Sequence, residues 1–165
     1  MGHPKKQKKK YESPKKLWDK ARIGREKKIL EEFGLRRKHE LWRMESILRA
    51  FRRRARELQA KPDEKKEKDL FEKLGKVGIH CAALDEVLSI RLENLLSRRL
   101  QTVVYKKGLA NSPRHARQLI VHGHVLLQDR KIRWPSYIVK RGEEEAISLR
   151  PQIAAKMVET VNAMK

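Results

Sequence analysis

The stretch SPRHARQLIVHGHV, residues 112–125, decides the fold of the second half of the chain. Ser112 is a preferred N-cap residue and Pro113 fits the first helical position, so a helix is predicted to begin here. Its apolar residues, which form the inward face, are Ala116, Leu119 and Ile120. Gly123 supplies the left-handed position that commonly ends a helix.

The other face of this predicted helix is polar. The residues that we expect to point away from the core are Arg114, Arg117, Gln118 and His122. The first of them lies near the helix N-terminus, where unpaired amide groups and the positive end of the helix dipole attract an anion. We therefore predict that this face contacts phosphate groups.

The segments around this helix complete a small unit that we assign to residues 90–150. Residues 90–104 have helical spacing, with Gly108 as the stop, and predict one preceding helix. The segments predicted as strands are residues 125–127, 131–133, 137–139 and 146–149. Because Gln128-Asp129-Arg130 lacks the Asn-Gly pair typical of two-residue hairpins, a tight turn is less favoured between the first two strands. The predicted fold is α+β, with two helices on an antiparallel sheet.

This unit resembles the S4-type RNA-binding domain, in which two helices and a small sheet form an L-shaped motif. The resemblance rests on residues 91–96, 112–120, 122–125 and 135–140. It implies that RNA is the source of the phosphates. Further candidate RNA contacts in this unit are Lys131, Tyr137, Lys140 and Arg141.

The charge of the chain also indicates a polyanion partner. Its 165 residues include 42 Lys or Arg and 21 Asp or Glu, which gives a formal net charge of +21. Residues 1–60 carry a net charge of +13 and residues 91–150 a net charge of +8, whereas residues 61–90 are nearly neutral. Lysine and arginine that neutralise phosphates release condensed counterions and gain affinity from that release. Two basic regions therefore flank a neutral connector.

The N-terminal part is predicted to be a basic tail followed by helices. We assign residues 1–16 to the tail, whose self-repelling lysines are Lys5, Lys6, Lys8, Lys9 and Lys10. Residues 17–89 form a helical domain and connector, with one helix between Pro14 and Gly34 and a longer one from about residue 38 to 60. A mixed-charge helix is expected over residues 61–76, ending at Leu74 and Gly75. Residues 151–165 are assigned to a C-terminal tail or helix.

The long helix carries a stripe of arginines beside its apolar stripe. Arg49, Arg52, Arg53 and Arg56 follow the spacing i, i+3, i+4, i+7, and Arg54 lies within the same run. Like charges four residues apart destabilise a bare helix. We therefore interpret the stripe as a phosphate-binding surface rather than an ordinary solvated face.

The N-terminal residues make the resemblance more specific. Residues 4–14, 33–36, 40–43 and 52–56, with Trp18 and Arg22-Ile23, are similar to the archaeal and eukaryotic branch of the ribosomal protein S4 family. The short ending after Met157 resembles the archaeal members. The resemblance covers nearly the whole chain.

That family resemblance implies a structural constituent of the small ribosomal subunit that binds ribosomal RNA. It further implies early assembly at a helix junction of the 5′ domain near the messenger entry channel, and a role in translational accuracy. The implied neighbours are the third and fifth small-subunit ribosomal proteins, on cytoplasmic ribosomes. An alternative is a related assembly factor of the small-subunit processome, which shares the RNA-binding domain.

Other functional classes receive no support from the residues. Cys81 is the single cysteine, so neither an internal disulfide nor a four-cysteine zinc site is expected. His122 and His124, with His115 nearby, lack cysteine partners at zinc spacing, so no metal is expected. His80 and Cys81 lack an orienting acid or an oxyanion motif and are interpreted as packed junction residues rather than a catalytic pair.

The sequence also lacks the features of enzymes and membrane proteins. It has no phosphate-cradling Gly-rich loop and no paired carboxylates in an apolar setting, so we expect no catalysis, no cofactor and no small-molecule substrate. An RNA-modifying enzyme would need a larger catalytic domain than the residues outside the compact unit provide. No apolar run approaches the ~20 residues that span a bilayer, so no membrane association is expected.

Overall fold

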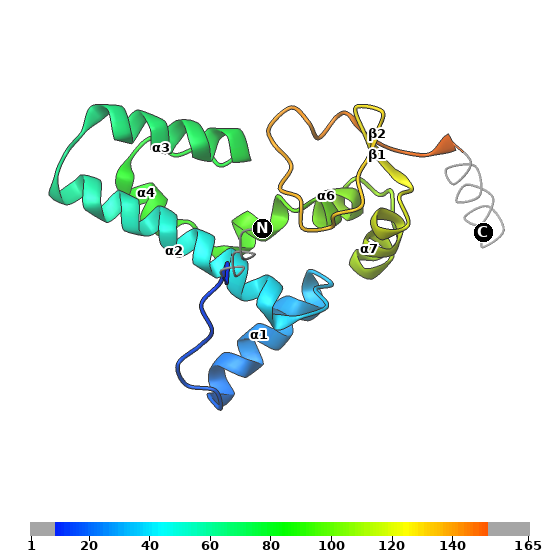
Figure 1. Ribbon diagram of the computed structural model, residues 1–165, viewed down its shortest axis with the longest axis horizontal. Helices are drawn as coiled ribbons and strands as arrows, with labels where there is room; N and C mark the ends of the chain where they lie inside the picture. The colour runs from blue at the N-terminus through cyan, green and yellow to red at the C-terminus, as the bar shows by residue number, and fades with distance from the viewer. Residues whose placement is uncertain (1–8, 152–165) are drawn as a thin grey trace, which may run out of the picture.

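The computed structural model describes residues 9–151, and Figure 1 shows their arrangement. The helices are α1 (Lys20–Glu32), α2 (Lys38–Ala60), α3 (Glu64–Val77), α4 (Leu84–Ser89), α5 (Leu92–Ser97), α6 (Leu100–Lys106) and α7 (Pro113–Val121). The strands are β1 (Val125–Leu127), β2 (Arg130–Lys131) and β3 (Ile147–Leu149). The α+β fold class is confirmed. None of the helices in residues 9–151 is both long and apolar enough to cross a membrane.

Helix α2 organises the N-terminal half, and α1, α3, α4 and α5 pack around it (Figure 1). Its bounds agree with the prediction from apolar spacing. The buried residues of the stripe are Leu41, Met44, Leu48, Ala55 and Leu58. Helix α4 makes the most extensive contact with α2, although the sequence patterns did not predict α4.

The neighbouring helices differ from the prediction at their ends. Helix α1 begins only at Lys20, because Asp19 caps it by accepting hydrogen bonds from the amides of Ala21 and Arg22. Helix α3 continues through Gly75 and ends at Gly78, whose φ of +83° provides the left-handed C-cap. A glycine inside a helix weakens it but does not end it when packing holds the next turn.

The predicted single helix over residues 90–104 is wrong. The chain breaks at Arg98 and Arg99, between α5 and α6, because the backbone there pairs with residues 137–139. The amide of Leu100 donates to the carbonyl of Tyr137 at 2.7 Å, and the amide of Val139 donates to the carbonyl of Arg98 at 2.9 Å. Residues 137–139 therefore form an isolated bridge to this break and not the predicted strand.

The sheet is antiparallel, with strand order β2-β1-β3. Residues 125–127 and 147–149 form strands as predicted, but β2 covers residues 130–131 and not 131–133. Because Leu127 pairs with Arg130, the turn between β1 and β2 holds only Gln128 and Asp129. Both have positive φ, 48° and 63°. The turn expected over residues 128–130 is therefore a two-residue turn, and Arg130 belongs to β2.

Two apolar cores lie side by side along the chain. The first includes buried residues from Phe33 to Leu96, and the second begins at Leu100 and includes α6, α7 and the sheet. The boundary between the cores lies between Leu96 and Leu100, whereas the sequence predicted a boundary at residue 90. Helices α5 and α6 connect the two, so the second unit is held directly against the first.

Candidate RNA-binding surface

Helix α7 presents the predicted polar face only in part. The Ser112 hydroxyl accepts a hydrogen bond from the amide of His115 at 3.1 Å, so the helix begins as expected. Its inward apolar residues are buried. Arg114, Gln118 and His122 are exposed and follow i, i+4, i+8 along one side. This side is open to a ligand.

Arg117 does not point freely to solvent, which corrects the prediction for this residue. Its guanidinium donates to both carboxylate oxygens of Glu40, at 3.0 and 3.1 Å. Arg99 donates to the same carboxylate at 2.8 Å and is only 2% exposed. Glu40 belongs to the first turn of α2, so this carboxylate joins the two halves of the molecule.

The charge state of Glu40 follows from these contacts. Burial would raise the pKa of Glu40, but hydrogen bonds and charge attraction from Arg117 and Arg99 outweigh it. The pKa therefore lies below its usual range, and the carboxylate is ionised at neutral pH. We call Glu40, Arg99 and Arg117 the carboxylate clamp.

Gln101 strengthens the same junction. Its side-chain amide is fully buried and donates to the carbonyls of Phe33, Gly34 and Pro113, at 3.1, 2.9 and 3.0 Å. A Cβ added to Gly34, whose φ is +59°, would lie 2.8 Å from the Cβ of Pro113. The turn between α1 and α2 therefore fits closely against the start of α7.

The arginine stripe on α2 also divides into free and engaged side chains. Arg52 is half-buried and donates to the carbonyl of Ile90 at 2.6 Å, so its place in an exposed stripe is a wrong expectation. Arg49 pairs with Glu12 at 2.6 Å, and Arg53 pairs with Glu57 at 2.8 Å, both on the surface. Arg54 and Arg56 are exposed.

The described part of the basic tail lies against α2. Tyr11 stacks on His39 with ring centroids 5.8 Å apart, and Lys9 lies 5.5 Å from the Tyr11 ring centroid. The amide of Glu12 donates to the Ser46 hydroxyl at 3.2 Å. Lys9 and Lys10 are exposed, and the other predicted tail lysines, Lys5, Lys6 and Lys8, lie outside the described residues. Tyr11 and Glu12, which belong to the predicted tail, therefore contact α2.

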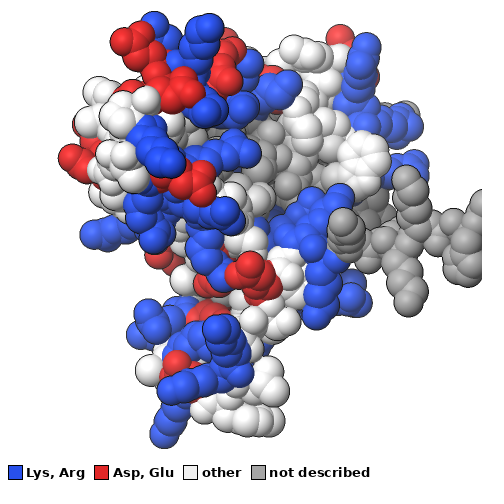
Figure 2. Space-filling view, turned by 60° about the vertical axis from the view of Figure 1, so that its left-hand side comes forward, with Lys and Arg blue, Asp and Glu red and all other residues white. Residues whose placement is uncertain are grey.

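The candidates in the last third of the chain are mostly open. Lys131, Lys140 and Arg141 are exposed. Tyr137 is half-buried, and its hydroxyl donates to Glu143 at 2.9 Å. Burial and that neighbouring carboxylate raise the pKa of Tyr137, so the phenol stays protonated. Figure 2 shows Lys and Arg side chains spread over one face of the molecule, with Asp and Glu side chains interspersed and most frequent at its upper end.

Comparisons with known proteins agree with this arrangement. The S4 domain family matches residues 98–144, which include the α5–α6 break, α6, α7, β1 and β2. Small ribosomal subunit protein uS4 of Hyperthermus butylicus is 49% identical over 156 residues, covering 92% of this chain and 89% of that protein. The chain belongs to the uS4 family.

Two further uS4 relatives give the same result. Small ribosomal subunit protein uS4 of Ignicoccus hospitalis is 49% identical over 156 residues, covering 92% of this chain and 94% of that protein. The uS4 protein of Saccharolobus islandicus is 48% identical over 153 residues, covering 89% and 84%. The family resemblance seen in the sequence is confirmed, and these relatives are archaeal.

Sequence reasoning missed several residues of this uS4 chain that the structure brings into view. Three of them, Glu40, Arg99 and Gln101, join the two halves. The sequence feature that could have identified Arg99 and Gln101 is a polar side chain at a position that faces the core. A buried polar group needs a partner, so Arg99 and Gln101 could have been assigned as junction residues. Arg133 is also exposed, close in sequence to Lys131, and was not among the predicted contacts.

The histidines and the cysteine of the uS4 chain lie as follows. Across residues 9–151, no group of three or more His, Cys, Asp or Glu side chains is placed to hold a metal ion. The rings of His122 and His124 stack with centroids 6.0 Å apart. His80 is exposed, while Cys81 is half-buried against the first core. Burial and the nearby Glu86 raise the pKa of Cys81, which keeps its thiol protonated and poorly nucleophilic.

Proposed function

We propose that this uS4-family chain is a structural constituent of the small ribosomal subunit and binds small-subunit ribosomal RNA. The observation that carries the proposal is the 49% identity over 92% of the chain to a protein named small ribosomal subunit protein uS4. The strong positive charge and the open basic side chains support it, because phosphate contacts supply most of the affinity of RNA-binding proteins. The proposed role is structural and not enzymatic.

The proposed RNA contacts include the tail lysines Lys5, Lys6 and Lys8 and the half-buried Tyr137, and the others fall into two groups. The first group is exposed and without a charged partner among residues 9–151, and consists of Lys9, Lys10, Arg54, Arg56, Arg114, Gln118, His122, Lys131, Lys140 and Arg141. The second group is Arg49 and Arg53, whose surface ion pairs are worth only ~0–1 kcal/mol and can be exchanged for phosphate contacts. Arg117 instead joins the two halves of the molecule through Glu40, and Arg52 holds the backbone at Ile90 against α2.

The finer features of the proposal rest on the family resemblance. We infer early binding to a helix junction in the 5′ domain of the RNA, near the messenger entry channel, with the third and fifth small-subunit proteins as neighbours. A contribution to translational accuracy on cytoplasmic ribosomes follows from that position. The exposed candidates come from both halves of the molecule, which suits a junction where several RNA helices meet.

Fractionation of cells on sucrose gradients tests this proposal against the processome alternative. A ribosomal constituent should co-sediment with mature small subunits and remain bound after a high-salt wash. If the chain sediments only with precursor particles and is absent from translating ribosomes, the assembly-factor role replaces the proposed one.

A further inference from the structure

A groove lies between the end of α2 and the start of α3, far from the second core (Figure 1). Its volume is about 430 Å³, which falls in the ~300–1,000 Å³ range of small-ligand sites. Its lining residues are Arg54, Glu57, Leu58, Lys61, Lys66, Asp69, Leu70 and Lys73. Arg54 lies within the arginine run of α2, but the sequence did not indicate a groove.

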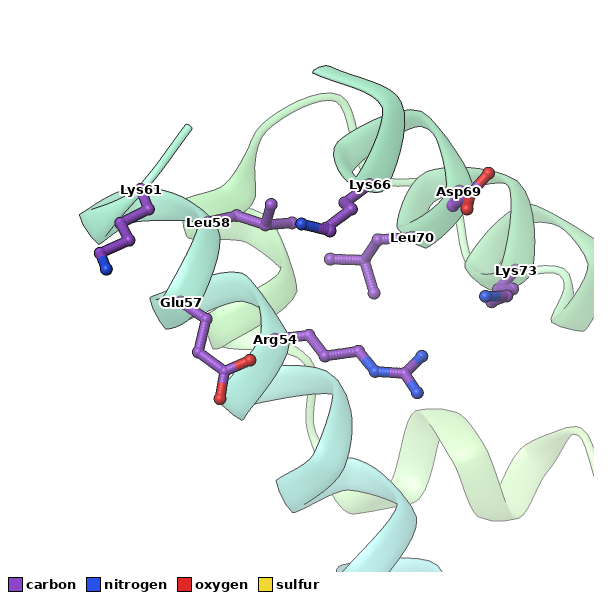
Figure 3. A pocket seen from close by; sticks show the side chains of 8 residues that line it. All are labelled: Arg54, Glu57, Leu58, Lys61, Lys66, Asp69, Leu70 and Lys73. Carbon is purple, nitrogen blue, oxygen red and sulfur yellow. The ribbon is translucent and has the colours of Figure 1, made fainter. Parts of the chain in front are cut away.

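The side chains around this groove are arranged by type (Figure 3). Leu58 and Leu70 lie between the two helices and form an apolar floor; they are 6% and 2% exposed. Arg54 extends from α2 toward α3, and Lys73 lines the groove from α3. Both acidic lining residues direct their carboxylates away from this floor. The groove therefore combines an apolar base with a positively charged rim.

The ion pairs around the groove leave that positive charge available. Glu57 is engaged by Arg53, and Lys66 pairs with Asp63 at 2.8 Å. Neither Arg54 nor Lys73 has an ion-pair partner within residues 9–151. The groove has more cationic than acidic lining residues, and a cleft with net positive charge beside low-dielectric walls attracts counter-ions. An anion is the expected ligand.

The size of the groove narrows the ligand class further. A free phosphate would meet the cations but leave most of the volume of about 430 Å³ empty. A stacked RNA helix would offer phosphates to the rim but keep its bases inside the duplex. A nucleotide extruded from the strand supplies both parts, since it has a phosphate and an unstacked flat base. The planar guanidinium of Arg54 can bind the phosphate through two oxygens or stack on the base.

We propose that this groove binds one unpaired nucleotide extruded from the ribosomal RNA. Its phosphate lies between Arg54 and Lys73, and its base fills the rest of the groove above the buried Leu58 and Leu70. The proposal rests on the proposed RNA-binding function and adds a nucleotide-sized site to it. The helical hairpin of α2 and α3 then recognises an unpaired nucleotide, in addition to attracting phosphates through its charge.

A second hollow, of about 350 Å³, shows why charge matters to this choice. Its lining includes Glu32 and Glu93 but only one cationic residue, Lys106. An anionic nucleotide would be repelled there. The groove between α2 and α3 has the opposite balance, with four cationic and two acidic lining residues.

The test compares two double variants of the full chain bound to small-subunit ribosomal RNA. Arg54→Gln/Lys73→Gln removes the two unpaired cations of the groove. Lys65→Gln/Lys68→Gln removes two exposed α3 charges that do not line it. The 2′-hydroxyl reactivity of every nucleotide is probed in each complex, and affinity is measured over a range of salt concentrations.

The groove variant should lose protection of one unpaired nucleotide that the wild type and the control variant protect. Its slope of log affinity against log salt should also become shallower by about 1, because the one phosphate held between the two cations loses its contact. Ultraviolet crosslinking of the wild-type complex, which needs no variant, should join an unpaired nucleotide to residues 54–73.

The outcomes separate this proposal from the function on which it rests. If the wild type binds the RNA but both double variants protect the same nucleotides, the groove site is wrong and the RNA-binding function stands. If the lost protection falls on base-paired nucleotides, a helix and not an extruded nucleotide occupies the rim, and the proposal fails. If the wild type does not bind the RNA at all, both proposals fail.

Discussion

Helices α2 and α7 both carry arginines at helical spacing, but in each helix only some of these arginines remain free. On α7, Arg114 is exposed while Arg117, one turn later, is held by Glu40. On α2, Arg56 is exposed while Arg52, one turn earlier, donates to the carbonyl of Ile90. Arginine spacing thus identifies helices with a basic face, whereas tertiary packing decides which arginines can reach a ligand.

The largest effect is expected from removing the Glu40 carboxylate, which accepts the hydrogen bonds of Arg117 and Arg99. Glu40→Ala leaves Arg99, which is 2% exposed, as a buried charge without its partner. Breaking a buried ion pair from one side typically costs ~3–5 kcal/mol. We expect the free energy of unfolding to fall by about 3 kcal/mol or more, measured by urea denaturation.

Glu45→Ala is the matched control, because Glu45 is on the same helix. Its carboxylate is 37% exposed and pairs with Arg49 only at 3.7 Å. Burial raises the pKa of Glu45, so its charge does not stabilise the fold. This variant should change the free energy of unfolding by less than ~1 kcal/mol. Equal losses for the two variants would show that the carboxylate clamp has no special role.

Single replacements of the two α7 arginines distinguish the engaged side chain from the exposed one. Arg117→Ala should lower the free energy of unfolding by ~1–3 kcal/mol, because hydrogen bonds to an ionised carboxylate are lost. Arg114→Ala should leave stability within ~0.5 kcal/mol of the wild type, since the side chain is exposed and unpaired within residues 9–151.

RNA binding should give the reverse order for these two variants. At a temperature where both are folded, Arg114→Ala should make the slope of log affinity against log salt shallower by about 1, the value for one phosphate contact. Arg117→Ala should leave that slope unchanged. Finding the loss of slope only in Arg117→Ala would mean that the clamp opens on RNA and that the two roles are exchanged.

Acid should weaken the clamp in a defined direction. The folded pKa of Glu40 is lowered, so its stabilising contribution is complete above the unfolded value of about 4.3 and is lost as pH falls through the folded pKa. The stability difference between wild type and Glu40→Gln should therefore be constant from about pH 7 to 5 and shrink below about pH 4. Urea titrations at several pH values measure it. A difference that grows on acidification would contradict the lowered pKa.

Local patterns predicted the elements that depend on neighbouring residues. The apolar stripe of α2 and the Ser112-Pro113 start of α7 lie within single helices, and both helices formed as expected. The break between α5 and α6 depends on Ile138, about 40 residues further along the chain, so helical spacing alone could not show it. The contacts of the candidate site could not be predicted for the same reason, because no local sequence pattern links Arg117 to Glu40.

The turn between β1 and β2 holds two residues that are not the ones preferred for its backbone conformation. Gln128 and Asp129 have φ of 48° and 63°, in the left-handed region that costs most residues ~1–2 kcal/mol. Asn-Gly is the preferred pair for a two-residue turn with two positive φ values. Replacing Gln128 by Asn and Asp129 by Gly should relieve strain, although glycine loses ~0.5–1 kcal/mol of chain entropy on folding.

The net expectation for this double variant is a gain of ~0.5–1 kcal/mol in the free energy of unfolding, with RNA affinity unchanged. Gly142→Ala is the opposite control, because Gly142 has φ of +84° and an added Cβ would meet no atom within 4 Å. Only backbone strain can act there, so a loss of ~1 kcal/mol is expected. Thermal unfolding of the two variants beside the wild type measures both effects. If the Asn-Gly variant is less stable than the wild type, the prediction is wrong. The side chains of Gln128 and Asp129 then make contacts in the turn that outweigh the strain of their positive φ values.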